Sequence, residues 1–522
     1  MESLDRNKLV SNLKNSDQIW DVVIIGGGAS GLGVALDAVS RGFKTLLLEQ
    51  NDFAKGTSSR STKLVHGGVR YLAQGNIDLV KEALYERGLL LKNAAHLVKN
   101  ETFIIPNYNW WGGIYYKIGL SLYDFLAGSK SFGKAKYLTK AKLLEKMPEL
   151  NKRNLRSGVS YQDGQFDDAR LAINLAQTCI EKGATLLNYF KVCKLLKEQE
   201  QISGLEVVDQ ETGLSYNVRG KVVVNATGVF VDEILKMDTP TGRPIVRPSQ
   251  GVHLVLDRSF CSSEDALMIP KTDDGRVLFA VPWHNKLILG TTDTPLEEHS
   301  LEPRALDQEI EFILKTASKY LQKQPTRADV LSVFAGLRPL AASNGDSSKT
   351  KEISRSHKII VSPSGLLTLT GGKWTTFRKM GEDTLDKAIK LGKLPAFPSK
   401  SKDISIHGNQ QAENRESHLY VYGADKEELL AFIKSKPEWA NPITANSEYL
   451  VGEIAWAVKA EMARTVEDFL ARRTRVLFLD AKLAIEMAPK VAEVMAAELN
   501  RPLSWQEDQV NSFTKLAKGY LI

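Results

Sequence analysis

The chain has 522 residues, of which 43% are hydrophobic and 25% charged. This composition is ordinary for a soluble globular protein, and the length predicts two or three domains. The net charge of +7 is mildly basic and no basic–aromatic tract accompanies it, so no nucleic-acid partner is expected. An anionic substrate, an anionic membrane surface and an ordinary solvated surface all fit that charge. Three cysteines without paired spacing exclude a disulfide framework, and eight histidines without metal-ligand spacing indicate no metal site.

A glycine-rich turn near the N-terminus predicts a dinucleotide site. Val22–Ile25 has the pattern of a buried parallel strand and runs directly into Gly26-x-Gly28-x-x-Gly31. The first glycine permits a tight turn, the second lets the backbone approach a pyrophosphate, and the third lets the following helix pack on the strand. The next strand ends at Glu49, an acid placed to bind ribose hydroxyls. This order favours a dinucleotide cofactor over an ordinary glycine-rich turn.

The segments that follow have hydroxyl-rich, helical and aromatic patterns. Thr57–Tyr71 combines hydroxyl, glycine and cationic residues, which is typical of an anion-binding loop, although an exposed loop has the same composition. Ile77–Leu97 has the spacing of an amphipathic helix. Asn109–Ala127 contains two tryptophans and three tyrosines. We favour a helix pair packed in a core over a membrane-interface or quinone-facing surface, because the apolar residues are not sharply confined to one face.

The middle of the chain predicts a return to the first sheet. Asp168–Lys182 has the pattern of a helix with Asp168 as its N-cap. Short strands are expected at Ala184–Leu196, Ser203–Asp209 and Ser215–Val218, which together predict a β-meander. Lys221–Gly228 is a further buried strand that leads into a glycine turn. We expect this strand to rejoin the first sheet, which makes the first domain discontinuous in sequence.

The second half predicts another sheet and then helices. Strands are expected at Arg247–Leu256, Val277–Val281, Lys286–Gly290, Leu331–Leu340 and Leu366–Thr370. Helices are expected at Glu309–Leu321, from Thr376 towards Leu391, and at Lys426–Ser435, Tyr449–Leu470 and Ala481–Leu499. The prolines, serines and lysines of Lys393–Lys402 indicate a linker before the last three helices.

These segments together resemble the FAD-dependent glycerol-3-phosphate dehydrogenases, within the glycine-oxidase and D-amino-acid-oxidase flavoprotein group. Seven motifs in the family's order carry the resemblance: GGGASGLGVALDA with Glu49, TSSRSTKLVHGGVRYL, NATGVFVD, VPWHNKLILGTTDT, FAGLRPL, TGGKWTTFRKMGEDTL and VEDFLARRTR. The resemblance implies oxidation of sn-glycerol 3-phosphate to dihydroxyacetone phosphate, with FAD taking the hydride and a membrane quinone receiving the electrons. It also implies a peripheral protein on the cytoplasmic, inner face of the cell membrane, with a homodimer as a further expectation.

The resemblance and the pattern predict an α/β fold class (α+β overall). We expect a Rossmann-like FAD-binding domain that is discontinuous in sequence, an antiparallel-sheet substrate domain and a C-terminal all-α domain. The expected segments are a polar leader (1–19), the FAD-binding domain (20–80, 150–240 and 335–392), the substrate domain (81–149 and 241–334), the linker (393–402) and the helical domain (403–522).

The resemblance implies cofactor contacts from the glycine-rich turn, the acid after it, the hydroxyl-rich loop and two later glycine turns. The candidate FAD-binding residues are Gly26, Gly28, Ala29, Ser30, Gly31, Glu49, Gln50, Ser58, Ser59, Lys63, Leu64, His66, Gly67, Gly228, Gly372, Trp374 and Thr375. The helix that begins after Lys373 is expected to direct its positive end towards the flavin N1–C2 region, which stabilises an anionic reduced flavin.

The substrate that the resemblance implies is a phosphate dianion. Candidates for binding its phosphate are therefore residues with side chains that donate hydrogen bonds to phosphate oxygens. Arg70, Tyr71 and Arg355 are these candidates, because a guanidinium pairs bidentately with phosphate. An ordinary surface charge explains Arg355 equally well. Arg338 lies between apolar residues in GLRPL, where an arginine is expected to have a buried anionic partner. We expect Arg338 to bind the C1–C2 oxygens and to stabilise developing alkoxide character.

The remaining candidates handle the hydroxyl group that is oxidised. His253, on a predicted strand, is the candidate base for the hydroxyl proton, although a core histidine with satisfied hydrogen bonds explains it nearly as well. Lys373 is expected to assist the flavin or the substrate. Thr291 and Thr292 are expected to line the pocket as hydroxyl donors.

Three alternatives stay open at this point. A glycerol-3-phosphate oxidase shares the motifs but gives its electrons to oxygen. A flavin-binding protein that catalyses no reaction is an alternative from a different functional class. An amine-oxidising relative fits less well, because Arg70, Arg338 and Lys373 suit a phosphate better than one carboxylate. Two segments are candidates for a membrane surface: Asn109–Ala127, and the basic tail at Arg472, Arg473 and Arg475.

Overall fold

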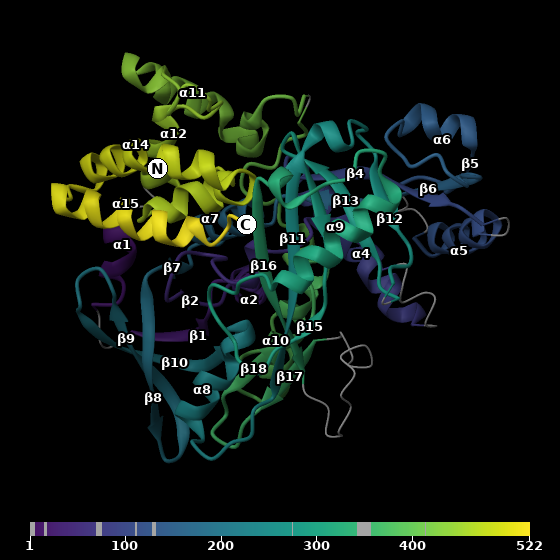
Figure 1. Cartoon of the computed structure of the whole chain (residues 1–522). Coiled ribbons are helices and arrows are strands. Elements are labelled where there is room, and N and C mark those ends of the chain that lie inside the picture. The colour runs from purple at the N-terminus through teal and green to yellow at the C-terminus, as the bar shows by residue number, and fades with distance from the viewer. Residues whose placement is uncertain are drawn as a thin grey trace.

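The computed structural model describes residues 6–14, 18–68, 76–109, 112–127, 132–273, 275–341, 357–412 and 414–522. Its α-helices are α1 (Arg6–Ser11), α2 (Ala29–Ser40), α4 (Ile77–Asn93), α5 (Gly112–Ala127), α6 (Lys140–Lys146), α7 (Asp168–Glu181), α8 (Val231–Asp238), α9 (Asp307–Tyr320), α10 (Phe377–Lys390), α11 (Lys426–Lys434), α12 (Val451–Ala460), α13 (Val476–Leu479), α14 (Ala481–Leu499) and α15 (Leu503–Lys518). Figure 1 shows α11, α12, α14 and α15 grouped at one corner of the molecule.

The smaller sheet contains the nucleotide-type unit expected from the sequence. Its strands are β1 (Ile19–Ile25), β2 (Thr45–Leu48), β7 (Thr185–Leu187), β8 (Phe190–Glu198), β9 (Gln201–Asp209), β10 (Ser215–Asn225), β17 (Lys358–Val361) and β18 (Leu367–Thr370). The order is β17-β18-β10-β1-β2-β7, and β18, β10, β1, β2 and β7 run parallel. β10 therefore rejoins the first strand, as predicted, and β8, β9 and β10 form the predicted antiparallel meander.

The larger sheet is mostly antiparallel. Its strands are β3 (Leu64–Val65), β4 (Val98–Asn107), β5 (Lys136–Thr139), β6 (Ser157–Phe166), β11 (Val246–Asp257), β12 (Ala266–Ile269), β13 (Leu278–Trp283), β14 (Lys286–Gly290), β15 (Thr294–Pro295) and β16 (Ser332–Ala341). They follow the order β15-β11-β14-β13-β12-β4-β6-β3, with β16 on β11 and β5 on β6. This arrangement confirms the predicted α/β class with a second, antiparallel sheet.

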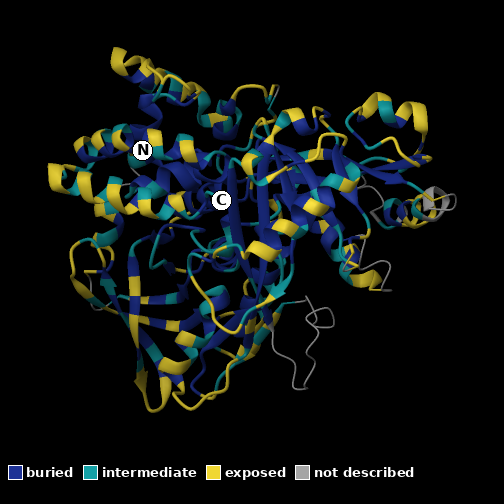
Figure 2. Cartoon of the chain, in the orientation of Figure 1, coloured by how far each residue is buried: buried dark blue, intermediate teal, exposed yellow. Residues whose placement is uncertain are grey.

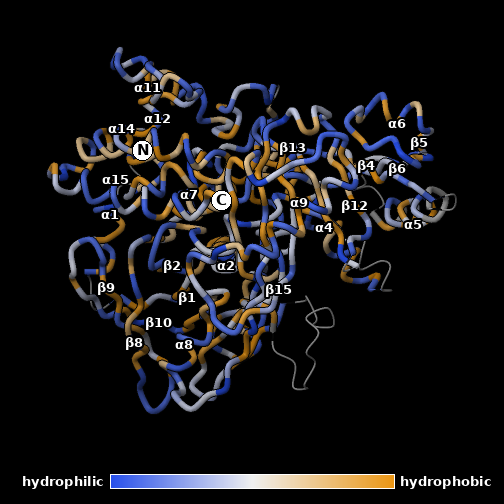
Figure 3. The backbone as a smooth tube through the Cα atoms, viewed as in Figure 1, coloured by the Kyte–Doolittle hydropathy of each residue, from blue (hydrophilic) through white to orange (hydrophobic). Residues whose placement is uncertain are grey.

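Burial explains why these strands lie at the centre. Val22, Val23 and Ile24 of β1 are fully buried, because both faces of a parallel sheet are covered. Figure 2 shows the central strands mostly buried, with exposed residues on the outer helices, on the loops and on the outer strand β8. In Figure 3 the hydrophobic residues likewise concentrate in the interior and the hydrophilic residues on the outer loops. α2 packs on α10 at two glycines: a Cβ on Gly381 would lie 2.1 Å from the Gly33 carbonyl oxygen.

Several elements differ from the sequence prediction for local reasons. Asp167, and not Asp168, is the N-cap of α7, because its carboxylate accepts from the Arg170 backbone N–H at 3.1 Å. The predicted strand Ala184–Leu196 is split into β7 and β8 at Tyr189, which has a left-handed φ of 61°. The predicted helix Tyr449–Leu470 is also wrong as one element. α12 ends at Ala460, Met462 has a φ of 56°, and a π-helix follows at Asp468–Arg473.

The expected domain segments differ from the strand pairing at three places. β3 and β6, within segments expected in the FAD-binding domain, hydrogen-bond in the larger sheet. β16, which spans the expected boundary at 335, pairs along β11 in that same sheet. The leader contributes a helix whose Leu9 is buried, and Ser399 and Ser401 of the expected linker hydrogen-bond to buried Asp37. The sheets, rather than sequence composition, therefore define the two central units.

Candidate active site

The glycine-rich turn connects β1 to α2 and opens onto a cavity of about 380 Å³. Gly26 has a φ of 108°, and a Cβ there would lie 2.7 Å from the Ala226 carbonyl oxygen. The N-cap of α2 is Gly28, which has no capping side chain, and the Ala29 N–H donates to Ser58 Oγ; the positive end of this helix favours an anion at its start. Gly31 does not line the cavity: a Cβ there would be 1.9 Å from the Gly26 carbonyl oxygen, so this glycine lets helix and strand pack.

The acid after β2 is held in place by backbone donors. The Glu49 carboxylate accepts from the Gly27 N–H at 2.7 Å and from the Asn51 N–H at 2.8 Å. Burial raises the pKa of this carboxyl, while the two N–H groups act in the opposite direction. Each carboxylate oxygen can accept more than one hydrogen bond, so Glu49 can also receive ribose hydroxyls.

Most of the predicted site residues line this one cavity. The cofactor candidates that line it are Gly26, Gly28, Ala29, Ser30, Glu49, Gln50, Ser58, Leu64, His66, Gly228, Gly372, Trp374 and Thr375. The catalytic candidates Arg338, His253 and Lys373 line it as well. The cavity thus extends from the parallel sheet to β11 and β16 of the larger sheet, and it joins the nucleotide-type turn to the catalytic candidates.

A segment that we call the cavity loop (Thr57–Leu64) forms one wall. Ser58 Oγ accepts from the Ala29 N–H at 2.9 Å, and the Ser58 carbonyl accepts from the Trp374 indole N–H at 2.8 Å. Thr62 Oγ1 lies 2.9 Å from His253 Nε2. The loop therefore ties the start of α2 to the turn after β18 and to β11.

Other candidates from the same motif lie behind the cavity. Ser59 and Lys63 are buried and do not line it; Lys63 Nζ donates to the Ser59 carbonyl and to Asp168, both at 2.7 Å. Burial, with nearby Arg475, lowers the pKa of Lys63 to about 7 against the opposing effect of Asp168. The Gly67 N–H donates to Tyr123 Oη at 2.7 Å, and a Cβ at Gly67 would collide with Leu84. These residues support the wall rather than face the cavity.

Arg338 lies on β16 and extends its guanidinium towards the cavity. Nη1 is 3.2 Å from the Asp293 carboxylate, and Nη2 donates to the Thr292 carbonyl at 3.0 Å. The predicted buried anionic partner is therefore Asp293 of the chain itself. The side chain of Arg338 remains 27% exposed and lines the cavity. Gly251 makes room for it, because a Cβ there would be 2.4 Å from Nη2.

His253 lies on β11, the strand that pairs with β16, where its register partner is Phe334. It is 2% exposed, and its ring stacks on Phe334 with a centroid distance of 4.8 Å. Burial, followed by the charges of Lys63 and Arg338, lowers the pKa of His253 well below its ordinary value. A neutral imidazole can accept a proton.

Two threonine candidates differ in position. Thr291 Oγ1 is 3.4 Å from Arg338 Nη2, so it lies beside the guanidinium, but Thr291 does not line the cavity. Thr292 is buried, accepts from the Val252 N–H at 3.0 Å and donates to Glu309 at 2.8 Å, so it supports β11 and does not line the cavity. Arg70, Tyr71 and Arg355 lie outside the described residues.

Sequence reasoning missed several residues at the cavity. Thr62 lines the cavity, and Asp293 contacts Arg338 without lining it; both belong to motifs that were recognised, and their hydroxyl and carboxylate groups were the available signal. Phe190 and Val192 line the cavity from β8, and their alternation within a predicted strand indicated a shared face. That this face meets the cavity depends on tertiary structure.

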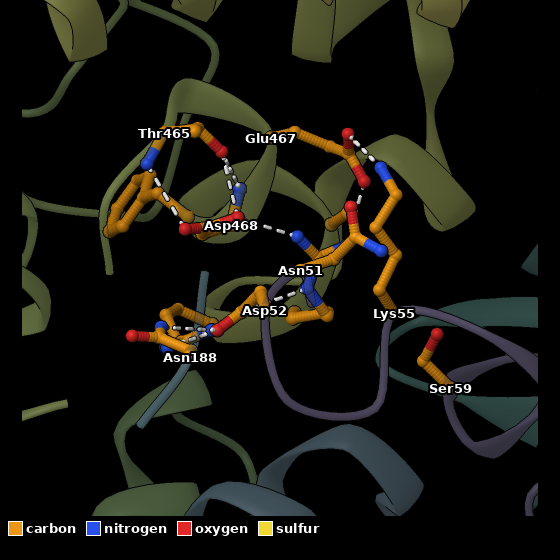
Figure 4. A network of polar contacts seen from close by, with 12 residues as sticks. Asn51, Asp52, Lys55, Ser59, Asn188, Thr465, Glu467 and Asp468 are labelled. Atoms are coloured by element: carbon orange, nitrogen blue, oxygen red, sulfur yellow. Dashed lines mark hydrogen bonds and ion pairs between the residues drawn. The ribbon is translucent and has the colours of Figure 1, made fainter. Parts of the chain in front are cut away.

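The basic tail is buried and is not a membrane-facing surface. Arg472, Arg473 and Arg475 are 1%, 2% and 1% exposed. Arg472 Nε and Arg473 Nη1 each lie 2.5 Å from the Asp52 carboxylate. Figure 4 shows Asp52 near Asn188 and Asp468, with Glu467 contacting Lys55. Carboxylates from a distant segment neutralise the arginines, which is why the sequence-based membrane interpretation was wrong.

No helix in the described ranges is both long and apolar enough to cross a membrane. Within the same part of the chain, no group of three or more histidine, cysteine, aspartate or glutamate side chains is arranged to hold a metal ion.

Comparisons with known proteins agree with this geometry. Residues 21–378 match the family described as FAD dependent oxidoreductase, and residues 367–510 match the C-terminal domain of alpha-glycerophosphate oxidase. The mitochondrial glycerol-3-phosphate dehydrogenase of Rattus norvegicus is 39% identical over 552 residues, which cover 98% of this chain and 75% of that protein. The corresponding protein of Saccharomyces cerevisiae is 36% identical over 594 residues, which cover 98% of this chain and 91% of that protein.

Solved structures show the same relationship. The X-ray structure of the glycerol-3-phosphate dehydrogenase from Bacillus halodurans complexed with FAD has a TM-score of 0.81 at 30% identity, and the match covers 100% of this chain and 98% of that chain. Glycine oxidase from Geobacillus kaustophilus shares the fold, with a TM-score of 0.52 at 19% identity over 73% of this chain and 96% of that chain. The glycine-lined turn and cavity fit FAD, and the chain belongs to the FAD-dependent glycerol-3-phosphate dehydrogenases of the FAD-dependent oxidoreductase family.

Proposed function

We propose that this protein oxidises sn-glycerol 3-phosphate to dihydroxyacetone phosphate and passes the electrons to a membrane quinone. One observation carries the proposal: Arg338, His253 and Lys373 line the same cavity as the glycine-rich turn. Relatives named glycerol-3-phosphate dehydrogenase match nearly the full chain, which supports this substrate.

The reaction removes a hydride from C2 of the substrate and a proton from its hydroxyl oxygen. When bound, FAD supplies the acceptor for that hydride. In our proposal Arg338 binds the oxygens at C1 and C2, and Asp293 orients its guanidinium. Because His253 is neutral, its imidazole can accept the hydroxyl proton. In our proposal Arg338 stabilises the negative charge that develops on the oxygen.

The remaining contacts are proposed on the sequence motifs. Lys373, which precedes the short 3-10 helix Trp374–Thr376, contributes positive charge at the cavity wall. Thr291, beside Arg338, is proposed to donate to a substrate oxygen. Arg70, Tyr71 and Arg355 remain our candidates for the phosphate.

Anaerobic flavin reduction tests the proposal. Addition of sn-glycerol 3-phosphate to the FAD-loaded protein should bleach the flavin absorbance. Arg338→Ala should abolish the bleaching while FAD stays bound, whereas Arg327→Ala, a change to a surface arginine paired with Asp307, should leave it unaltered. A flavin that stays oxidised in the wild-type protein would favour the non-catalytic alternative. Wild-type bleaching by Arg338→Ala would remove Arg338 from the reaction.

The electron acceptor is a separate part of the proposal. After anaerobic bleaching, a short-chain quinone should restore the oxidised flavin faster than air does. Faster recovery in air would favour the oxidase alternative, because flavin-proximal motifs are shared by dehydrogenases and oxidases of this group.

We further propose a peripheral position on the cytoplasmic, inner face of the cell membrane, with a homodimer as the assembled form. Ile118 and Leu122 on α5 are 66% and 48% exposed, and Tyr137 on adjacent β5 is 46% exposed. Leu120 and Tyr123 of α5 are buried, so the helix has one packed and one open apolar face. Co-sedimentation with phosphatidylglycerol vesicles, and its loss in Ile118→Ser/Leu122→Ser, would support this position. Wild-type binding by that variant would contradict it.

A further inference from the structure

Asp168 occupies the first position of α7 but does not cap that helix. Asp167 serves as the N-cap, so the Asp168 carboxylate is available for other contacts. Its Oδ2 accepts from the Ser61 backbone N–H at 3.1 Å, from Ser61 Oγ at 2.7 Å and from Lys63 Nζ at 2.7 Å. These three hydrogen bonds fix the cavity loop to Asp168, which is fully buried and does not line the cavity.

The other oxygen of Asp168 binds an arginine from the C-terminal region. Arg475 Nη2 donates to Asp168 Oδ1 at 3.0 Å and to the Ser59 carbonyl at 2.9 Å. The guanidinium carbon also lies 4.6 Å from the centroid of the Phe478 ring. Arg475 is 1% exposed, so it is held in place by these contacts and not by solvent.

Both cations around Asp168 have an uncommon backbone conformation. Lys63 has a φ of 65° and Arg475 a φ of 69°, in the left-handed region that disfavours side chains. Such residues persist where the surrounding structure fixes them, and they cluster at functional sites. Here both of them donate to the same carboxylate and to the same Ser59 carbonyl.

The cavity loop presents its other side to the proposed reaction site. Ser58 contacts the start of α2 and the Trp374 indole, while Thr62 lies within hydrogen-bond distance of His253. A displacement of the loop would change all three contacts. Among them, the Thr62 contact at Nε2 is the one that bears on the orientation of the His253 ring.

We propose that Arg475 is a positioning residue of the active site. Through Asp168 and the Ser59 carbonyl it holds the cavity loop, so that Thr62 keeps the His253 ring in one orientation. The C-terminal region is thus part of the catalytic architecture, although within the described residues its arginine does not line the cavity. This inference rests on the proposed function of His253.

The test compares Arg475→Met with Arg170→Met in the full-length protein. Arg170 is equally buried and also joins α7 to the C-terminal region, through Glu461 at 2.8 Å, but does not contact the cavity loop. In the FAD-free protein, Arg475→Met should speed amide hydrogen exchange at residues 57–64, and Arg170→Met should not. This readout does not depend on catalysis.

In the FAD-loaded protein, Arg475→Met should lower the rate of flavin reduction by sn-glycerol 3-phosphate about 10- to 100-fold, with a smaller change in KM, because a small misplacement of a catalytic group is costly. Arg475→Lys should recover part of the rate, and Arg170→Met should retain the wild-type rate. Unchanged exchange and unchanged reduction in Arg475→Met would overturn the inference. Failure of the wild-type protein to be reduced would instead overturn the proposed function.

A milder variant covers the case in which Arg475→Met does not fold. Ser61→Ala keeps every buried charge; it removes the hydrogen bond from Ser61 Oγ to Asp168 and the one that Ser61 Oγ accepts from the Lys63 N–H within the cavity loop. It should accelerate exchange at residues 57–64 and lower the reduction rate about threefold to tenfold, by the same sensitivity to placement. Wild-type values for both measurements in Ser61→Ala would also overturn the inference.

Discussion

Asp52→Asn tests how much the ion pairs of Asp52 with Arg472 and Arg473 stabilise the contact between the C-terminal region and the segment that follows β2. The Asp52 carboxylate is fully buried and accepts from Arg472 Nε at 2.5 Å, from Arg473 Nη1 at 2.5 Å and from Arg473 Nη2 at 3.1 Å. Burial alone would raise the pKa of this carboxyl, but the charges of Arg473 and Arg472 bring it below its ordinary value. The carboxylate is therefore ionised at neutral pH.

The amide keeps the size of the side chain but removes its charge. Breaking a buried ion pair by removing one partner costs about 3–5 kcal/mol, because the remaining charge is left uncompensated. Arg472 keeps Glu467 at 2.8 Å and Asp468 at 2.7 Å, so the loss should fall near the lower limit. We expect the free energy of unfolding to fall by about 3 kcal/mol.

Urea unfolding of the FAD-free protein, followed by tryptophan fluorescence, measures this loss. Asp386→Asn is the matched control. Asp386 also pairs with an arginine, Arg41, at 2.7 Å, but the Asp386 side chain is 42% exposed, whereas the Asp52 side chain is fully buried. An exposed pair contributes less than about 1 kcal/mol. Equal losses in the two variants, or a more stable Asp52→Asn protein, would refute the reasoning.

Two further predictions follow from helix packing and from histidine ionisation. Gly381→Ala should destabilise the protein by about 1–3 kcal/mol and weaken FAD retention, since its Cβ would meet the Gly33 carbonyl of α2. Gly119→Ala in α5, where the Cβ meets open space, should show neither effect in urea unfolding and flavin-content assays. Burial would lower the pKa values of His407 and His418, but hydrogen bonds to Asp425 and Glu181, and to Glu448 and Glu453, raise both to about 9. Because these folded-state pKa values exceed the unfolded value, their stabilisation is complete below about pH 6.5 and is lost as pH rises through 9. The urea concentration at the unfolding midpoint should decrease as the pH is raised from 7 to 9.5. This decrease should be smaller in His407→Asn/His418→Asn, and equal decreases in that variant and the wild-type protein would contradict the prediction.

The amino-acid sequence by itself determined the features that depend on neighbours along the chain. The β1–turn–α2–β2 unit follows from a buried strand, three glycines and Glu49 within a short span, because each residue acts on the conformation beside it. The cavity-lining positions of Ser58, Arg338 and Lys373 were predicted for the same reason, since each belongs to a contiguous motif. Local pattern also predicted the β8–β9–β10 meander.

Tertiary structure alone decided which distant groups meet. Arg472, Arg473 and Arg475 resemble a solvent- or membrane-facing basic patch in sequence, and become buried because Asp52 and Asp168, several hundred positions away, supply carboxylates. Thr62 acquires its relation to His253 only when the cavity loop crosses β11. Pairing between charges that are hundreds of residues apart leaves no pattern along the chain, whereas strand and helix periodicities do, so the first needs the folded structure and the second does not.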